Sequence, residues 1–436
     1  RIAAIILHLL VGLVVLDGSV WAQGMDREKL RMAQTFERTG DMRGAARIYQ
    51  ELHATDPRND AYFQGVVRSL SALQQYAALL PLVEQQATRA PSLQTFILAG
   101  TLNSRVGNMA KAETWWAEAM KQADDRENAY VMIGQEQMQL NLHAQALASY
   151  RSARALNSNS TAYAEEIARL CALTGDIAAS AREVVALYGA EGDIIQAQRQ
   201  LSILLASDGG ANAIAVELAR LPDTYADVLR LKQWFYRQTK NWKSALGITE
   251  KLDEQSRQRG QELLLFADGA RSDDQYDVAV EAYAIVLREV KDERMRMSAA
   301  YGSARALDQK LRSARTIGPD EARTLVERYD EIIERYGQHP IAADALYHAA
   351  VLEDEVLQNT DRARDRLMRL LNTWRGTTTW IDAALRLADI YLAMRRDAEA
   401  VNVLRMVLAT PQNVATDRRD LARLRLGDLH FWEGNL

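Results

Sequence analysis

The side chains that could perform catalysis are scattered along this sequence and form no recognised motif. Adjacent carboxylates at Glu165–Glu166 and Asp273–Asp274 could act as general acid and base only if a cleft buried them. His339 and His348 stand nine residues apart, which is neither a metal-ligand spacing nor a shared helical face. The sequence has no glycine-rich phosphate loop, no cysteine pair and no nucleophile elbow. We therefore expect a protein that is not an enzyme and that has no cofactor and no metal site.

The charged residues indicate an ion-paired surface rather than a nucleic-acid site. Lysine and arginine total 53 against 58 aspartate and glutamate, a net charge of −5, whereas a nucleic-acid-binding protein needs a basic face. Arginines cluster at 362–369 and 418–425, but acids are interspersed in both clusters. Asp365 and Arg369, for example, are four residues apart, so they could pair along one helix. We expect no nucleic-acid partner.

Two aromatic clusters, Trp115–Trp116 and Trp234–Phe235–Tyr236, could stack on sugars or bases. Adjacent residues of a helix point about 100° apart, so at most one member of each cluster can face a ligand. Which member does so depends on the helices that carry them.

Those helices follow a 34-residue period. Like residues recur at this interval: Gly100 with Gly134, Ala112 with Ala146, Trp116 with Tyr150, and Ala119 with Ala153. Such self-similarity indicates one helical hairpin copied along the chain, because a single hairpin cannot bury its own apolar face. Trp116 then falls on the face that packs between hairpins and is expected inside.

Each copy has the same internal order. A glycine such as Gly107 ends the first helix, and the small Ala112 five residues later lets the second helix approach closely. Trp116 and Ala119 complete an apolar stripe at i, i+4 and i+7. Pro57 and other helix-breaking residues then stop the second helix.

This order of residues resembles the tetratricopeptide repeat, with residues 26–57 as the best fit. The resemblance implies an all-α fold, a right-handed superhelical solenoid of helical hairpins. We expect regular repeats over 23–190, divergent hairpins over 191–316, and hairpins with longer helices over 317–436, the last repeat being incomplete. Within the last part, the run from Tyr329 to Tyr347 resembles hairpins of bacterial outer-membrane assembly and Tol-Pal-associated solenoid proteins.

The two ends of the chain differ from the repeats. Residues 2–16 form an apolar run that follows Arg1 and precedes a small residue, Ala22, so 1–22 is predicted to be a signal peptide. An uncleaved anchor is the alternative, although a membrane-spanning helix needs roughly 20 apolar residues. We expect export to the periplasm of a Gram-negative cell, with a mature chain that is soluble or peripherally bound to the envelope. We also expect the native chain to continue past Leu436.

In the resembling family, partners bind in the groove lined by the first helix of each hairpin. The candidate lining residues here mix apolar and amide side chains: Leu30, Gln34, Glu37, Ile97, Thr101, Ser104, Val131, Gln135 and Met138. Such a surface suits an extended or helical peptide with apolar anchors. Chaperone-binding members carry a lysine and asparagine clamp for a terminal carboxylate, where this sequence has Leu30 and Gln34, so that activity is not expected.

The leader and the repeats together favour an exported scaffold that binds protein or peptide partners in envelope assembly or transport. Two alternatives remain open: the periplasmic arm of an exopolysaccharide exporter, with polysaccharide as a partner, or the solenoid of a larger envelope enzyme such as a lytic transglycosylase. The sequence after Leu436 would discriminate between them. Alternating ten-residue segments would favour the exporter, and a domain with a catalytic glutamate would favour the enzyme.

Overall fold

The computed structural model describes residues 25–314, 317–375, 377–410 and 416–432. Within these ranges every regular element is a helix, which confirms the predicted all-α repeat fold. None of the helices in the described ranges combines the length and apolar character needed to cross a membrane. The predicted signal peptide, 1–22, lies outside the described residues.

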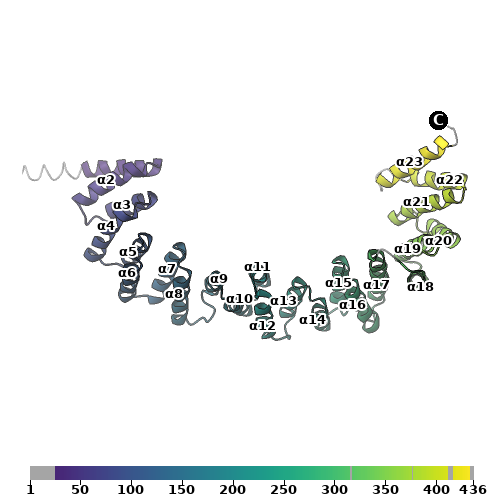
Figure 1. Ribbon diagram of the computed structural model, residues 1–436, viewed down its shortest axis with the longest axis horizontal. Helices are drawn as coiled ribbons and strands as arrows, with labels where there is room; N and C mark the ends of the chain where they lie inside the picture. The colour runs from purple at the N-terminus through teal and green to yellow at the C-terminus, as the bar shows by residue number, and fades with distance from the viewer. Residues whose placement is uncertain (1–24, 315–316, 376, 411–415, 433–436) are drawn as a thin grey trace, which may run out of the picture. The chain divides into compact units, whose positions relative to one another are not determined.

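Successive helices fold back on one another as hairpins (Figure 1). The chain divides into two compact units, Arg1–Ala219 and Arg220–Leu436. In the first unit a helix over residues 25–39 precedes α2 (Met42–Thr55), α3 (Asp60–Ala72), α4 (Tyr76–Arg89), α5 (Leu93–Arg105), α6 (Met109–Gln122), α7 (Arg126–Gln139), α8 (His143–Leu156), α9 (Ala164–Leu173), α10 (Ile177–Glu191), α11 (Ile194–Leu205) and α12 (Gly210–Ala219).

The second unit continues the same alternation with several longer helices. It contains α13 (Ala226–Gln238), α14 (Trp242–Gln255), α15 (Gln261–Ser272), α16 (Tyr276–Glu289), α17 (Glu293–Ser313), α18 (Pro319–Arg335), α19 (Ile341–Glu355), α20 (Thr360–Thr373), α21 (Thr378–Ala393), α22 (Asp397–Leu408) and α23 (Thr416–Trp432). α17 has 21 residues and ends before residue 317. The predicted domain boundaries remain predictions.

The turns inside the hairpins form where glycine or asparagine was expected to end the first helix. Gly107 has φ +84° and Asn141 has φ +59°, both in the left-handed region that these residues tolerate. After Gly107, the amide of Asn108 donates to the carbonyl of Asn103 at 2.8 Å, which satisfies an end carbonyl of α5. The turn chemistry therefore positions α5 against α6 as the spacing predicted.

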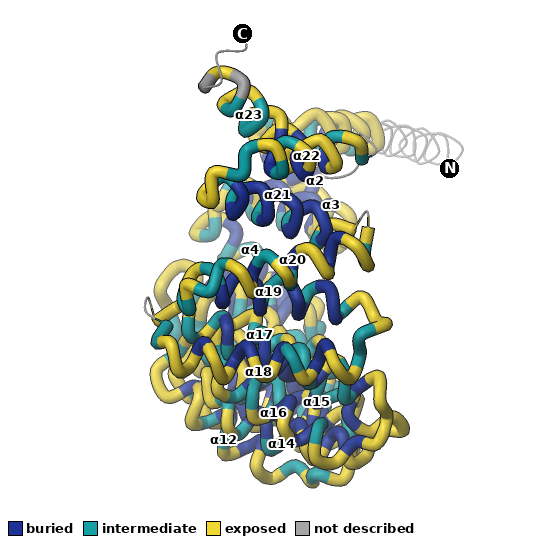
Figure 2. The backbone as a smooth tube through the Cα atoms, turned by 90° about the vertical axis from the view of Figure 1, so that its right-hand side faces the viewer, coloured by how far each residue is buried: buried dark blue, intermediate teal, exposed yellow. Residues whose placement is uncertain are grey.

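The packing positions are buried as predicted. Ala112 is 0% exposed and Trp116 is 4% exposed, and their counterparts Ala146 and Tyr150 are 0% and 3% exposed. Figure 2 shows the same concentration of buried positions along α21 of the second unit, where Trp380 is fully buried. The cores are thus continuous layers between neighbouring hairpins, and function must lie on the helix faces and edges that they leave outside.

Candidate partner-binding surfaces

The nine predicted lining residues lie on three first helices but differ in their exposure. Gln34 and Gln135 are exposed, and five others are half-buried: Leu30, Glu37, Ser104, Val131 and Met138. Ile97 and Thr101 on α5 are only 4% exposed each, because neighbouring helices cover them. A partner cannot reach these two side chains, so we exclude them from the lining of the groove.

Two lining residues, Glu37 and Thr101, form hydrogen bonds with the first helix of the next hairpin. Glu37 accepts a hydrogen bond from Arg68 Nε at 2.6 Å and another from Tyr49 Oη at 2.9 Å. The hydrogen bond from Arg68, followed by that from Tyr49, holds the pKa of Glu37 below its usual value against the opposing effect of burial. Thr101 Oγ1 donates to Glu136 at 3.2 Å in the same way. These contacts join successive hairpins and reduce the charge that a partner would meet.

The side-chain amides of Gln34 and Gln135 are available for hydrogen bonds to a partner. Neither side chain makes a hydrogen bond to another residue in the described part of the chain. A primary amide offers two donors and an acceptor, which can match the backbone of a bound peptide. Beside Gln135, Met138 and Val131 rest on the cluster that contains Tyr150 and Ile167. Together they form an apolar surface with an amide at its centre.

The aromatic clusters belong to the packing rather than to a stacking platform. Trp115 is half-buried, lies against Phe96 with ring centroids 5.9 Å apart, and donates through Nε1 to Glu84 at 3.3 Å. Phe235 is buried at 4% exposure. Trp234 is half-buried on α13.

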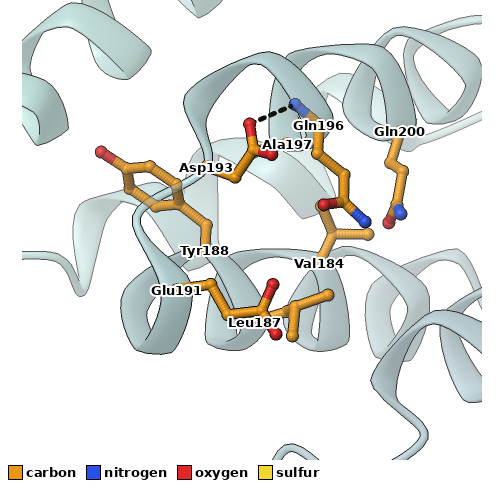
Figure 3. A pocket seen from close by; sticks show the side chains of 8 residues that line it. All are labelled: Val184, Leu187, Tyr188, Glu191, Asp193, Gln196, Ala197 and Gln200. Atoms are coloured by element: carbon orange, nitrogen blue, oxygen red, sulfur yellow. Dashed lines mark hydrogen bonds between the residues drawn. The ribbon is translucent and has the colours of Figure 1, made fainter.

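The cavity between α10 and α11 is too small for a ligand (Figure 3). Its volume is about 10 Å³, and Val184, Tyr188 and Gln196 are among the residues that line it. A space of roughly 10–15 Å³ holds no more than one water molecule. Asp193 at its edge accepts a hydrogen bond from the backbone N–H of Gln196 at 3.0 Å and thereby caps α11. This feature is structural.

Two larger cavities adjoin each other in the second unit. The first, of about 660 Å³, lies among the start of α17, the end of α18, the loop to α19, and Arg369 of α20. The second, of about 180 Å³, lies between α16, α17 and α18 and shares Arg335 and Tyr336 with the first. Sequence reasoning missed both. Of the lining residues, only Arg369 was discussed from the sequence, as the ion-pair partner of Asp365. In the structure Asp365 pairs instead with Arg364 at 2.9 Å.

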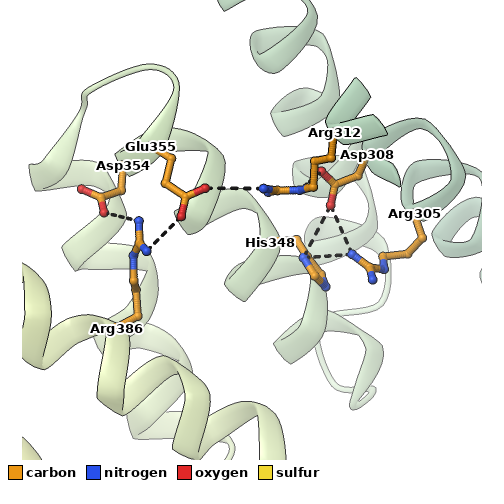
Figure 4. A network of polar contacts seen from close by, with 7 residues as sticks. All are labelled: Arg305, Asp308, Arg312, His348, Asp354, Glu355 and Arg386. Carbon is orange, nitrogen blue, oxygen red and sulfur yellow. Dashed lines mark hydrogen bonds and ion pairs between the residues drawn. The ribbon is translucent and has the colours of Figure 1, made fainter. Parts of the chain in front are cut away.

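A network of charges that range from buried to exposed joins the first helices α17, α19 and α21 (Figure 4). Asp308, 1% exposed, accepts from Arg312 Nε at 2.8 Å and from Arg305 at 3.1 Å. Arg312 also reaches Glu355, which pairs with Arg386 of α21 at 2.9 Å. Since these charges are satisfied within the protein, the network fixes neighbouring hairpins rather than offering a binding site.

His348 belongs to this network as a neutral side chain. Burial, and then the positive charges of Arg305 and Arg312, lower its pKa to about 3. Its Nδ1 lies 3.1 Å from Arg305 Nη1, and since the imidazole is neutral the guanidinium is the donor. The ring stacks against Tyr329 with centroids 5.8 Å apart. Within this network His348 therefore acts as a hydrogen-bond acceptor for Arg305.

The geometry defines a protein built from stacked helical hairpins. The sequence profile of the tetratricopeptide repeat family matches residues 344–376 and 382–412, which cover α19–α20 and α21–α22. These two hairpins are therefore tetratricopeptide repeats. Such repeats are typically non-catalytic, and their extended surfaces bind other proteins. The chain is thus a scaffold for protein–protein interaction.

The chain is similar to solved structures at low sequence identity. Yeast Tom70 is 11% identical with a TM-score of 0.34, and the match covers 94% of this chain and 96% of that chain. A chain of the Cut9–Hcn1 hetero-tetramer is 13% identical with a TM-score of 0.26, and the match covers 90% and 95%. These values are too low to transfer any partner. No curated protein matches the chain. The likeness of 329–347 to outer-membrane assembly and Tol-Pal-associated proteins stays a prediction.

Proposed function

We propose that this protein is an exported scaffold that binds segments of partner proteins along the first helices of its first unit, in assembly or transport at a bacterial cell envelope. The observation that carries the proposal is the stripe on α7, where the exposed Gln135 stands between the half-buried Val131 and Met138. Gln34 provides an equivalent exposed amide in the first hairpin.

This pattern supports recognition of a peptide rather than of a small molecule. The amide of Gln135 can pair with a peptide backbone, whatever the side chains of that peptide are. Val131 and Met138 are held from below by the cluster around Tyr150, so they present apolar surface in a fixed place. Methionine also adapts its shape to different partners. The stripe therefore suits an extended or helical segment with one or two apolar anchors.

The export part of the proposal rests on residues 2–16. Fifteen nearly uninterrupted apolar positions after a basic residue, with a small residue at the expected cleavage point, are typical of a secretory leader. An anchor that stays uncleaved would hold the same repeats in the same compartment. Both forms are compatible with partners at the envelope.

Site-specific photo-cross-linking in the producing cells tests the proposal. A benzophenone amino acid would replace Gln135 or Gln34, and the matched control would carry it at the exposed Glu113 on α6, a second helix. We expect discrete adducts at both glutamine positions, none at Glu113, and envelope proteins as the cross-linked species identified by mass spectrometry. Equal adducts at Glu113 would contradict the assigned face. Adducts with cytoplasmic proteins alone would contradict export.

A further inference from the structure

We give the two neighbouring cavities of the second unit one name, the α17–α18 cleft, because they share lining residues. They meet at Arg335 and Tyr336, and their volumes are about 660 and 180 Å³. Ligand-binding pockets commonly measure about 300–1,000 Å³, so the larger cavity can hold several side chains of a partner. The cleft lies in the other unit from the α7 stripe and would form a separate site.

Part of the lining of each cavity is apolar, and charged side chains make up much of the rest. Met297 and Ala300 of α17, both half-buried, lie one helical turn apart. Ile332 and Ile333 of α18 face them from the other side, each 3% exposed. An apolar side chain that packs against these four residues leaves water and gains apolar contact.

One arginine of the rim is neutralised within the protein. Glu293 accepts from Arg335 Nε at 2.7 Å and from Tyr336 Oη at 2.9 Å. The hydrogen bond from Tyr336, followed by that from Arg335, lowers the pKa of Glu293, so its carboxylate stays ionised and keeps Arg335 occupied.

Three other rim arginines are different. The guanidinium groups of Arg294, Arg328 and Arg369 make no ion pair or hydrogen bond to any residue in the described part of the chain. Nearby arginines are paired, as Arg366 is with Asp330 at 2.8 Å. Glu331 and Glu334 also line the cleft and have no ion pair among the described residues. Counted over those residues, the unpaired rim charges are three positive and two negative.

We propose that the α17–α18 cleft binds an extended segment of a partner protein in which an apolar side chain stands next to an acidic residue. The apolar side chain occupies the space beside Met297, and the carboxylate pairs with Arg294 or Arg369 at the rim of the larger cavity. Charge-assisted hydrogen bonds of this kind are the strong ones. Nucleic acid is disfavoured as the occupant because Glu331 and Glu334 would repel its phosphates.

Fluorescence anisotropy with the full chain and fluorescein-labelled decapeptides tests this. The probe is a glycine–serine peptide with a central leucine–aspartate pair, and its counterparts carry leucine–lysine or glycine–aspartate instead. We expect the leucine–aspartate peptide to bind about tenfold more tightly than either counterpart, with the preference weakening as salt rises. Equal affinity for the three peptides, or no saturable binding at about millimolar protein, would overturn the proposal.

The variants locate the site. Arg369→Glu should weaken the leucine–aspartate peptide by about tenfold or more and shift the preference towards leucine–lysine. Arg375→Glu is the matched control, because Arg375 is also exposed and lies outside both cavities. Met297→Trp, which fills the cavity without changing charge, should weaken both leucine peptides. Circular dichroism melts confirm that each variant is folded.

Two results would refute the location. One is an unchanged affinity in Arg369→Glu and Met297→Trp, and the other is an equal loss in Arg375→Glu. An oligouridylate RNA that binds more tightly than the peptide, and loses binding in the same variants, would replace the peptide as occupant and also overturn the proposal. Because Gln135 lies in the other unit, Gln135→Ala should leave the anisotropy unchanged. A result that refutes the binding site in the α17–α18 cleft is therefore distinguishable from one that refutes partner binding at the α7 stripe.

Discussion

Substituting Gly100 by alanine tests the packing of the hairpins directly. An ideal Cβ at Gly100 would lie 2.4 Å from Trp116 Nε1 and 2.5 Å from Trp116 Cδ1. The Trp116 ring is 4% exposed and rigid, so it cannot move aside without disturbing its neighbours. Overpacking of this kind costs about 1–3 kcal/mol. Against it stands the gain of about 1 kcal/mol that alanine brings over glycine inside a helix.

Gly247 of α14 separates the two effects. It too lies inside a helix, but no atom outside its own stretch of helix stands within 4 Å of the position that a Cβ would take there. Gly247→Ala should therefore show the helix gain alone, about 1 kcal/mol of added stability. The free energy of unfolding of Gly100→Ala should be lower than that of Gly247→Ala by the overpacking cost, about 1–3 kcal/mol. Relative to wild type, Gly100→Ala should therefore be between neutral and clearly destabilised.

Amide hydrogen exchange is the suitable assay, since repeat arrays need not unfold in one step. Each 1.4 kcal/mol of local stability changes the exchange rate about tenfold. We expect exchange across α5 and α6 in Gly100→Ala to be equal to or faster than in wild type, and exchange across α14 in Gly247→Ala to be slower than in wild type. Trp116→Leu should relieve the penalty of Gly100→Ala in a double-mutant cycle. An equal stabilisation by both glycine substitutions would refute the close contact.

Three further results are expected. Trp116→Ala should cost roughly 3–5 kcal/mol, whereas Gln135→Ala should stay within about 0.5 kcal/mol, as thermal melts would show; the reverse order would contradict the register. Acid should destabilise the second unit, because the unfolded state protonates His348 near its ordinary pKa of 6.5 while the folded state does so at about 3. Stability should fall between pH 6.5 and about 3, by at most about 1.4 kcal/mol for each pH unit. His348→Gln should flatten that dependence in melts at pH about 5–7. Mass spectrometry of the exported protein should find cleavage after Ala22 with Gln23 as the new end.

The helical hairpins could be predicted because their signals are local. A glycine that tolerates positive φ, a small residue five positions later and an aromatic residue after that each act within one hairpin. Gly107, Ala112 and Trp116 therefore occupy the expected turn, contact and core positions in the structure.

The surfaces were harder to predict because they depend on neighbours that are distant in sequence. Ile97 was expected at the surface, but the next hairpin covers it. Asp365 and Arg369 are correctly spaced for a pair, yet Arg364 lies closer to that carboxylate. The α17–α18 cleft has no periodic signature, since its lining residues come from four helices and a loop.

The charge network and the cleft are connected through the same helices. The Asp308 network braces α17 against α19, and Arg366 joins α20 to Asp330 of α18 at 2.8 Å. Both walls of the cleft are therefore held from outside it, and a partner does not have to order them on binding. Preorganised sites lose less conformational entropy, so their affinity follows the contacts they make. That is why reversing a single rim charge at Arg369 should change affinity about tenfold rather than be absorbed by movement of the helices.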